Sequence, residues 1–380
     1  MTRSVIKKKV QSYYDITLFL LVLFICVFGL IMVYSTSSYN AYRFYNDSQL
    51  YLTRQLKILG IGFAGMILLS IVDYHLFSKP LFNTKINATH ILLVLATGLM
   101  LFVTVSGYSA GGSARWIKLP GGFNLQPSEI LKIAVILLAA YSVSAMSQKN
   151  RNRFAGFFRI LLYVAIPVGL VAVENLTTAI IIFVIVAGIC FVASMKNLMF
   201  VLTGLGAGAV GALLIVFRGY RSERINIWLN VETASGGYQI MQGLYAIASG
   251  GLLGKGLGES MQKLGYIPEA HTDMIFSVIC EELGMIGAIA VIALFLMVLW
   301  RLFRIAINAP DLFGGLIATG VLIHIAIQVL INIAVVTNLI PPTGIPLPLI
   351  SYGGSSQIVF LGEIGIALSV SNQTVRELDT

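Results

Sequence analysis

The chain has 380 residues, of which 57% are hydrophobic and only 11% charged, and its mean hydropathy is +0.89. Soluble proteins carry roughly 25% charged residues, so this composition excludes an ordinary soluble domain. The net charge of +9 comes from basic residues scattered over loop ends. It favours anionic lipid or a phosphate-bearing substrate over nucleic acid as the partner.

Long apolar runs predict the fold class. Runs near 20 residues indicate membrane-spanning helices, whereas a β-barrel shows short alternating segments. We therefore predict an all-α integral membrane protein, a single polytopic domain over residues 1–380 with about ten transmembrane helices. The predicted spans are 16–36, 57–74, 89–106, 127–146, 158–173, 176–194, 198–217, 273–300, 312–335 and 346–370.

The distribution of basic residues predicts the orientation. No cleavage site of small residues follows the first span, which is therefore interpreted as a retained helix. Lysine and arginine favour the segment before it and the loops on the same side of the membrane, which predicts that both termini are cytoplasmic. One long connection between helices 7 and 8, about 218–272, is then extracytoplasmic. Its mixture of glycine and apolar residues favours short helices at the outer membrane surface.

The stretch 111–135 is the first that could carry chemistry. Arg115 and Lys118 lie on a short outer loop, and Glu129 and Lys132 follow at the start of the fourth span. The spacing of three residues places Glu129 and Lys132 on one helix face, where they can pair. They form either an ion pair that fixes the topology or the polar wall of a substrate groove.

Three arginines begin the long loop. Arg218, Arg221 and Arg224 recur every three residues and share one face if the segment is helical. Arginines placed in this way can bind phosphate through two parallel hydrogen bonds, or they can anchor the chain to lipid headgroups.

The stretch "PEAHTDMIFSVICEELG", 268–284, concentrates acids at the start of the eighth span. Glu281 lies about 12 Å further along the helix than Asp273 and is rotated by about 80°, so the two are poorly placed as a carboxylate pair. Asp273 is then either a single base at the membrane boundary or part of a helix cap made by Thr272 or Asp273 itself. Glu281 and Glu282 descend into the bundle, where acids usually face a cavity or a partner.

Prolines and the glycine-rich "SYGGSS" break the backbone in the stretch 337–357. Irregular backbone at membrane depth is tolerated only where protein or water satisfies it. Glycine and serine amides could cradle a phosphate there, although the pattern is not that of a nucleotide-binding loop.

Four strings in this chain resemble the SEDS family of bacterial cell-wall proteins (shape, elongation, division and sporulation). They are "ARWIKL", "QPSEILK", "GGYQIMQGLYAIASGGLLGKGLGESMQKLGYIPEAHTDMIFSVICEELG" and "PPTGIPLPLISYGGSS", and they follow the family order across most of residues 111–357. The "PEAHTD" form resembles the FtsW-like division branch, to which RodA and SpoVE are related.

The resemblance implies an inverting peptidoglycan glycosyltransferase that polymerises lipid II into glycan strands at the outer face of the bacterial cytoplasmic membrane. Asp273 matches the family's key aspartate and would deprotonate the 4-hydroxyl of the acceptor sugar. Cations would balance the pyrophosphate of the leaving group. The candidate substrate-binding residues are Arg115, Lys118, Arg221 and Arg224 as cations, Glu129 and Lys132 as the charged pair, and Tyr238, Gln239, Gln242, His271, Thr272, Ser351, Gly353, Gly354, Ser355 and Ser356 at motif positions without an assigned role.

The resemblance also implies partners. These are lipid II and the growing glycan strand, a class B penicillin-binding protein that supplies the transpeptidase, and other divisome membrane proteins. No cluster of metal ligands is evident in the sequence, so no cofactor is assigned and a divalent cation such as Mg²⁺ is left open. Two alternatives remain: a lipid II flippase, in which Glu129, Lys132, Glu281 and Glu282 line a polar path, and a non-enzymatic division scaffold.

One stretch departs from the family pattern. Family members carry a "QPDLGTA"-like stretch after the fifth span, and this chain has "VENLTTA" at 173–179. Asn175 therefore stands where the family has an aspartate, which puts any role of that acid in doubt here.

Overall fold

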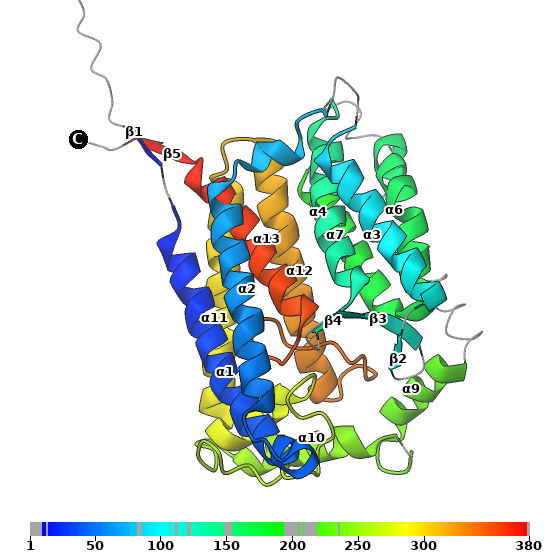
Figure 1. Ribbon diagram of the computed structural model, residues 1–380, viewed down its shortest axis with the longest axis vertical. Coiled ribbons are helices and arrows are strands. Elements are labelled where there is room, and N and C mark those ends of the chain that lie inside the picture. The colour runs from blue at the N-terminus through cyan, green and yellow to red at the C-terminus, as the bar shows by residue number, and fades with distance from the viewer. Residues whose placement is uncertain are drawn as a thin grey trace, which may run out of the picture.

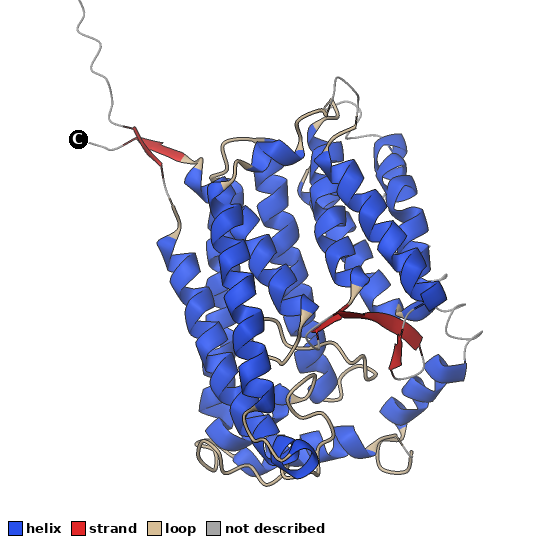
Figure 2. Ribbon diagram, in the orientation of Figure 1, coloured by secondary structure: helices blue, strands red, loops and turns tan. Residues whose placement is uncertain are grey.

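The computed structural model describes residues 10–12, 14–81, 86–106, 108–110, 113–119, 123–147, 154–193, 204, 208, 219–234 and 236–377. Within these residues the chain is a bundle of long helices that run side by side, with two small sheets at its margins (Figure 1, Figure 2). Five of the described helices, α1, α2, α4, α11 and α12, are long and apolar enough to cross a membrane.

Nine of the predicted spans coincide with helices. These are α1 (Ile16–Tyr45), α2 (Leu50–Ile71), α3 (Ala88–Ser106), α4 (Pro127–Ser144), α6 (Phe154–Glu174), α7 (Leu176–Val192), α11 (Ile275–Ile307), α12 (Leu312–Val336) and α13 (Ser355–Asn372). The tenth predicted span, 198–217, lies outside the described residues except for Gly204 and Gly208.

The start of the last span was predicted wrongly. The prediction placed it at residue 346, whereas α13 begins at Ser355. Residues 337–354 form turns and irregular backbone instead. Prolines lack the N–H group that a helix interior requires, and four of them lie between Pro341 and Pro348.

The face that α1 turns outward shows why these helices suit lipid. Large apolar side chains are exposed along one stripe of the helix: Ile16, Leu20, Phe24, Val27 and Ile31. Another stripe, which includes Leu18, Val22, Ile25 and Met32, is buried in the bundle. A helix that is apolar on its exposed face as well as its buried face is typical of a membrane span.

α2 and α13 pack closely side by side (Figure 1). Small residues allow this approach, because a Cβ on Gly365 would lie 2.6 Å from the carbonyl oxygen of Met66. Gly62 of α2 similarly faces Leu361 of α13. Such small-residue contacts are a common means of helix association within membranes.

The long connection before α11 contains two short helices, α9 (Gly219–Leu229) and α10 (Tyr238–Gly250). Both lie at one end of the bundle, opposite the two terminal strands (Figure 1). A second sheet, formed by β2 (Tyr108–Ala110), β3 (Ser113–Leu119) and β4 (Phe123–Leu125), connects α3 to α4.

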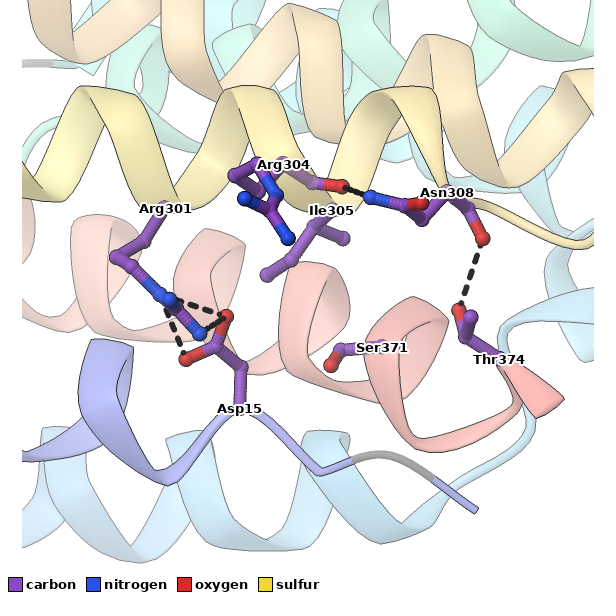
Figure 3. Close-up of a pocket in the computed structure, with 7 residues that line it drawn as sticks. All are labelled: Asp15, Arg301, Arg304, Ile305, Asn308, Ser371 and Thr374. Carbon is purple, nitrogen blue, oxygen red and sulfur yellow. Dashed lines mark hydrogen bonds and ion pairs between the residues drawn. The ribbon is translucent and has the colours of Figure 1, made fainter. Parts of the chain in front are cut away.

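The first and last strands that the structure describes meet at the other end of the bundle. Strand β1 (Val10–Ser12) pairs antiparallel with β5 (Val375–Glu377), and the 3₁₀ helix η1 (Tyr74–Phe77) follows α2. Beside these strands, Asp15 caps α1 and binds Arg301 of α11 through contacts of 2.7–3.1 Å (Figure 3). The pocket around this pair measures about 10 Å³, room for about one water.

Candidate active site

A cavity of about 170 Å³ lies where β3, α4, α7 and α12 meet the irregular segments before α11 and α13. Seven of the residues predicted from the sequence lie in its wall: Arg115, Glu129, Thr272, Asp273, Gly353, Gly354 and Ser356. The fold therefore brings three of the sequence motifs, which are far apart along the chain, to one place.

Asp273 does not cap a helix, contrary to one of the two interpretations drawn from the sequence. The N-cap of α11 is Met274, and no side chain caps that helix end. The Asp273 carboxylate instead receives hydrogen bonds from the Thr272 hydroxyl at 3.3 Å and from Gln239 Nε2 at 3.4 Å. Asn332 Nδ2 donates to the Asp273 carbonyl at 2.8 Å. Gln239 of α10 and the neighbouring Thr272 therefore hold the carboxylate in place, and Asn332 of α12 holds the Asp273 backbone.

Burial raises the pKa of Asp273 above its ordinary value of 3.8, and the negative charge of Glu269 adds to the rise. Hydrogen bonds from the Asp273 backbone and the Thr272 hydroxyl, together with the positive charge of Arg224, oppose this rise in the pKa without cancelling it. A carboxylate with a raised pKa is a better proton acceptor than an ordinary surface aspartate.

His271 supports this loop and does not line the cavity. Its ring is 6% exposed and lies 4.4 Å from the Tyr51 ring and 5.4 Å from the Tyr352 ring, centroid to centroid. Its carbonyl accepts a hydrogen bond from Tyr352 N at 2.8 Å, which connects the two loops. Burial lowers the pKa of His271 to about 4, so the ring is neutral at physiological pH.

The predicted cations occupy different places. Arg115 lines the cavity, and its Nη2 donates to the Glu174 carbonyl at 2.8 Å. Arg224 Nη1 donates to the carbonyls of Pro342 and Thr343 at 3.0 and 3.2 Å, so it braces the irregular segment before α13.

Lys118 and Arg221 are not placed in the cavity wall. Lys118 is exposed on β3 and does not line the cavity. The side chain of Arg221 lies outside the described residues.

Glu129 and Lys132 pair, as their spacing in the sequence predicts. Their side chains pair at 2.9 Å and are almost fully buried. Glu129 lines the cavity, whereas Lys132 lies behind it with its Nζ 5.8 Å from the centre of the Phe360 ring. The ion pair therefore lies in the bundle interior, and its Glu129 member lines the cavity.

Some residues of the "SYGGSS" stretch line the cavity, and others stabilise the loop itself. Gly353, Gly354 and Ser356 line the cavity. Ser351 accepts a hydrogen bond from Leu347 N at 2.9 Å, and Ser355 accepts one from Gln126 N at 3.1 Å. The two buried serines thus hold the loop in shape rather than face the cavity.

The predicted residues of α10 lie behind Asp273 or at the surface. Gln239 binds Asp273 and also donates to the Pro268 carbonyl at 3.3 Å. Tyr238 is 45% exposed, Gln242 is half-buried, and neither lines the cavity. Gln239 is the one member of this motif that contacts the candidate base.

Glu281 and Glu282, to which the sequence assigned no definite role, hold the long loop onto α11. Glu281 pairs with Lys255 at 2.6 Å, and Glu282 pairs with Lys263 at 2.7 Å. Ser260 also donates to Glu281, and Ser35 of α1 donates to Glu282 at 2.7 Å. Neither acid lines the cavity.

Sequence reasoning missed several residues of the cavity wall, of which Asn175 and Gln328 are the most informative. Asn175 caps α7, where its side chain accepts a hydrogen bond from Thr178 N at 3.2 Å. Gln328 could have been found, because His324, Gln328 and Asn332 recur every four residues on an otherwise apolar span. That spacing places three polar groups on one helix face, and polar residues within a membrane span usually face the bundle interior.

Among the residues that the structure describes, no group of three or more His, Cys, Asp or Glu side chains could hold a metal ion. The described part of the chain therefore offers no preformed set of protein ligands for a divalent cation. A requirement for such a cation stays a hypothesis.

The chain is similar to known proteins over nearly its whole length. The family described as "Cell cycle protein", which groups FtsW, RodA and SpoVE, matches residues 16–376. The chain is 39% identical to the probable peptidoglycan glycosyltransferase FtsW of Geobacter sp. (strain M18), over 96% of this chain and 98% of that protein. It is 40% identical to the stage V sporulation protein E of Bacillus subtilis (strain 168), over 94% of this chain and 96% of that protein.

A solved structure has the same fold. It was described under the heading "Structural coordination of polymerization and crosslinking by a peptidoglycan synthase complex", and it matches with a TM-score of 0.77 and 27% identity over 95% of this chain and 98% of that one. The sequence match over nearly the whole chain, the shared helical bundle and the motifs gathered at the cavity agree. The chain belongs to the FtsW/RodA/SpoVE family of membrane-embedded cell cycle proteins.

Proposed function

We propose that this chain is a peptidoglycan glycosyltransferase that polymerises lipid II at the outer face of the cytoplasmic membrane. The observation that carries the proposal is the shared cavity, which Asp273 and Arg115 line together with the glycine-rich loop. A proton acceptor and a cation in one cavity suit the attack of a sugar hydroxyl on a donor that leaves as a pyrophosphate.

In the proposed reaction Asp273 accepts the proton of the acceptor's 4-hydroxyl. The hydroxyl oxygen attacks the anomeric carbon of the donor, and the bond from that carbon to the pyrophosphate breaks on the opposite face, with inversion. The pyrophosphate departs with the bonding electrons and its negative charge, which Arg115 offsets. General-base assistance of this kind contributes a factor of about 10²–10⁴ in rate.

The placement of the cavity supports an extracytoplasmic reaction. Asp273 accepts a hydrogen bond from Gln239 of α10, and α10 lies at the end of the bundle opposite the paired strands β1 and β5 (Figure 1). We propose that the terminal end is cytoplasmic, in agreement with the distribution of lysine and arginine. The substrate's polar head then enters the cavity from the outer surface while its lipid tail stays between helices.

The proposed partner is a class B penicillin-binding protein that crosslinks the strands, together with other divisome membrane proteins. Support comes from the matched structure, whose heading names a peptidoglycan synthase complex that couples polymerization and crosslinking.

Two observations count against the flippase alternative. Glu281 and Glu282 are each paired with a lysine of the long loop and lie outside the cavity wall. Of the four charged residues of the postulated polar path, only Glu129 lies in the cavity wall. A scaffold, the other alternative, has no need of a carboxylate with a raised pKa at a polar cavity.

The test is the reconstitution of the full chain with its penicillin-binding partner and purified lipid II. Asp273→Asn keeps the shape of the side chain but removes the base, and we expect it to abolish glycan strands while the protein stays folded. Glycan synthesis by this variant would refute the catalytic role of Asp273. Lipid II flipping without polymerisation by the unmodified chain would instead establish the transporter.

A further inference from the structure

Two residues of the cavity wall each have one buried oxygen atom that lacks a hydrogen-bond partner within the described part of the chain. The atoms are Oε2 of Glu129 and Oε1 of Gln328. Both residues line the cavity, and they are only 7% and 2% exposed, respectively. Buried polar atoms are nearly always paired, so two unpaired acceptors on residues of one cavity wall call for an explanation.

The other atoms of these side chains are committed to the bundle interior. Oε1 of Glu129 binds Lys132 Nζ at 2.9 Å. Nε2 of Gln328 lies 3.0 Å from Nε2 of His324, and His324 Nδ1 lies 2.7 Å from the Glu363 carboxylate. With the imidazole proton on Nδ1, facing Glu363, Nε2 of His324 accepts from the Gln328 amide. This chain of contacts fixes the amide nitrogen of Gln328 toward His324, and its oxygen is left over.

The unpaired oxygens define the kind of ligand that the cavity wall recognises. Each buried acceptor without a partner is unfavourable. Both oxygens are closed off in this structure, so a ligand with N–H or O–H groups relieves that cost when the side chain rotates and presents its oxygen to the cavity. The cavity also holds a cation, Arg115, so its occupant combines hydrogen-bond donors with negative charge. At about 170 Å³ the cavity accepts far more than one water, which needs about 10–15 Å³.

We propose that Glu129 and Gln328 form an acceptor subsite for the hydroxyl and acetamido N–H groups of an N-acetylated amino sugar. His324 and Glu363 are positioning residues that orient Gln328. The inference rests on the proposed function and deepens it, because it assigns the sugar of the substrate to Glu129 and Gln328 and leaves the pyrophosphate to Arg115.

The test measures binding to the full chain in lipid nanodiscs with two probes, lipid II and undecaprenyl pyrophosphate, which has the same leaving group but no sugar. Gln328→Met keeps the length of the side chain and removes its amide. We expect Gln328→Met to weaken lipid II binding by about 3- to 10-fold, the loss of a single hydrogen bond, and to leave undecaprenyl pyrophosphate binding unchanged.

Two further variants keep the test decisive. Gln373→Met alters a glutamine at the opposite end of the bundle, beside His75, and should bind both probes normally. If Gln328→Met fails to fold, Gln328→Asn retains a buried amide but withdraws it from the cavity, and it should show the same selective loss. Unchanged lipid II binding, or equal weakening for both probes, would overturn the sugar subsite.

The binding measurement separates this inference from the proposed function. An unmodified chain that polymerises lipid II, combined with Gln328 variants that bind it normally, refutes the subsite alone. An unmodified chain that binds lipid II with the selective Gln328 effect but makes no strands refutes the glycosyltransferase and leaves the subsite standing.

Discussion

Lys263 and Lys255 should contribute unequally to stability, although each pairs with one of two adjacent glutamates. Lys263 Nζ binds Glu282 at 2.7 Å, Ser35 Oγ at 2.8 Å and the Gly258 carbonyl at 2.7 Å, with 7% of its side chain exposed. Without Lys263, the fully buried Glu282 keeps the Ser35 hydroxyl as its partner among the described residues. Removing one partner of a buried ion pair costs about 3–5 kcal/mol, which is the loss we expect for Lys263→Met.

Lys255 provides the matched control. Its side chain is 33% exposed, and its partner Glu281 also accepts from Ser260 Oγ and from the backbone N–H groups of Met261 and Gln262. Because those donors remain, Lys255→Met should cost less, about 1–2 kcal/mol.

The assay is the equilibrium unfolding of the purified chain in detergent, with each lysine variant compared to the unmodified protein. The double variant Lys263→Met/Glu282→Gln removes the unpaired charge and should regain much of the stability lost in Lys263→Met alone. Equal losses for Lys263→Met and Lys255→Met, or no recovery in the double variant, would refute the reasoning that a stranded buried carboxylate dominates the cost.

Three further predictions concern the base, a helix cap and a helix contact. Polymerisation requires the ionised form of Asp273, so its rate should fall as pH drops through a pKa above the ordinary 3.8; a rate that is flat down to pH 4 would contradict this base. Asn175→Ala should cost about 1 kcal/mol because α7 loses its cap, whereas Asn175→Asp keeps an acceptor and should unfold at nearly the same temperature as the unmodified chain. Gly365→Ala should lower the free energy of unfolding by about 1–3 kcal/mol because the new Cβ meets the Met66 carbonyl, whereas Gly60→Ala, with open space around it, should be neutral in the same measurement.

The hydropathy of the sequence was sufficient to predict most helices of the bundle. A run of about 20 apolar residues is a local property, and lipid selects it irrespective of the neighbouring helices. The position of Asp273 at the junction of a loop and a span is also local, and so is the family signature around it. The start of α13 was missed because the apolar residues between the prolines satisfy the hydropathy pattern but not the hydrogen bonding of a helix.

The arrangement of the site depended on tertiary structure. Helical spacing separated Asp273 from Glu281 correctly, but it did not reveal that Lys255 and Lys263 neutralise the two glutamates. Nor did it reveal that Gln328 completes the cavity wall. Hydropathy and helical period describe a residue relative to its own segment. Ion pairs, cavity walls and unpaired oxygens arise between segments distant in sequence, and only the packing of the bundle decides which of them meet.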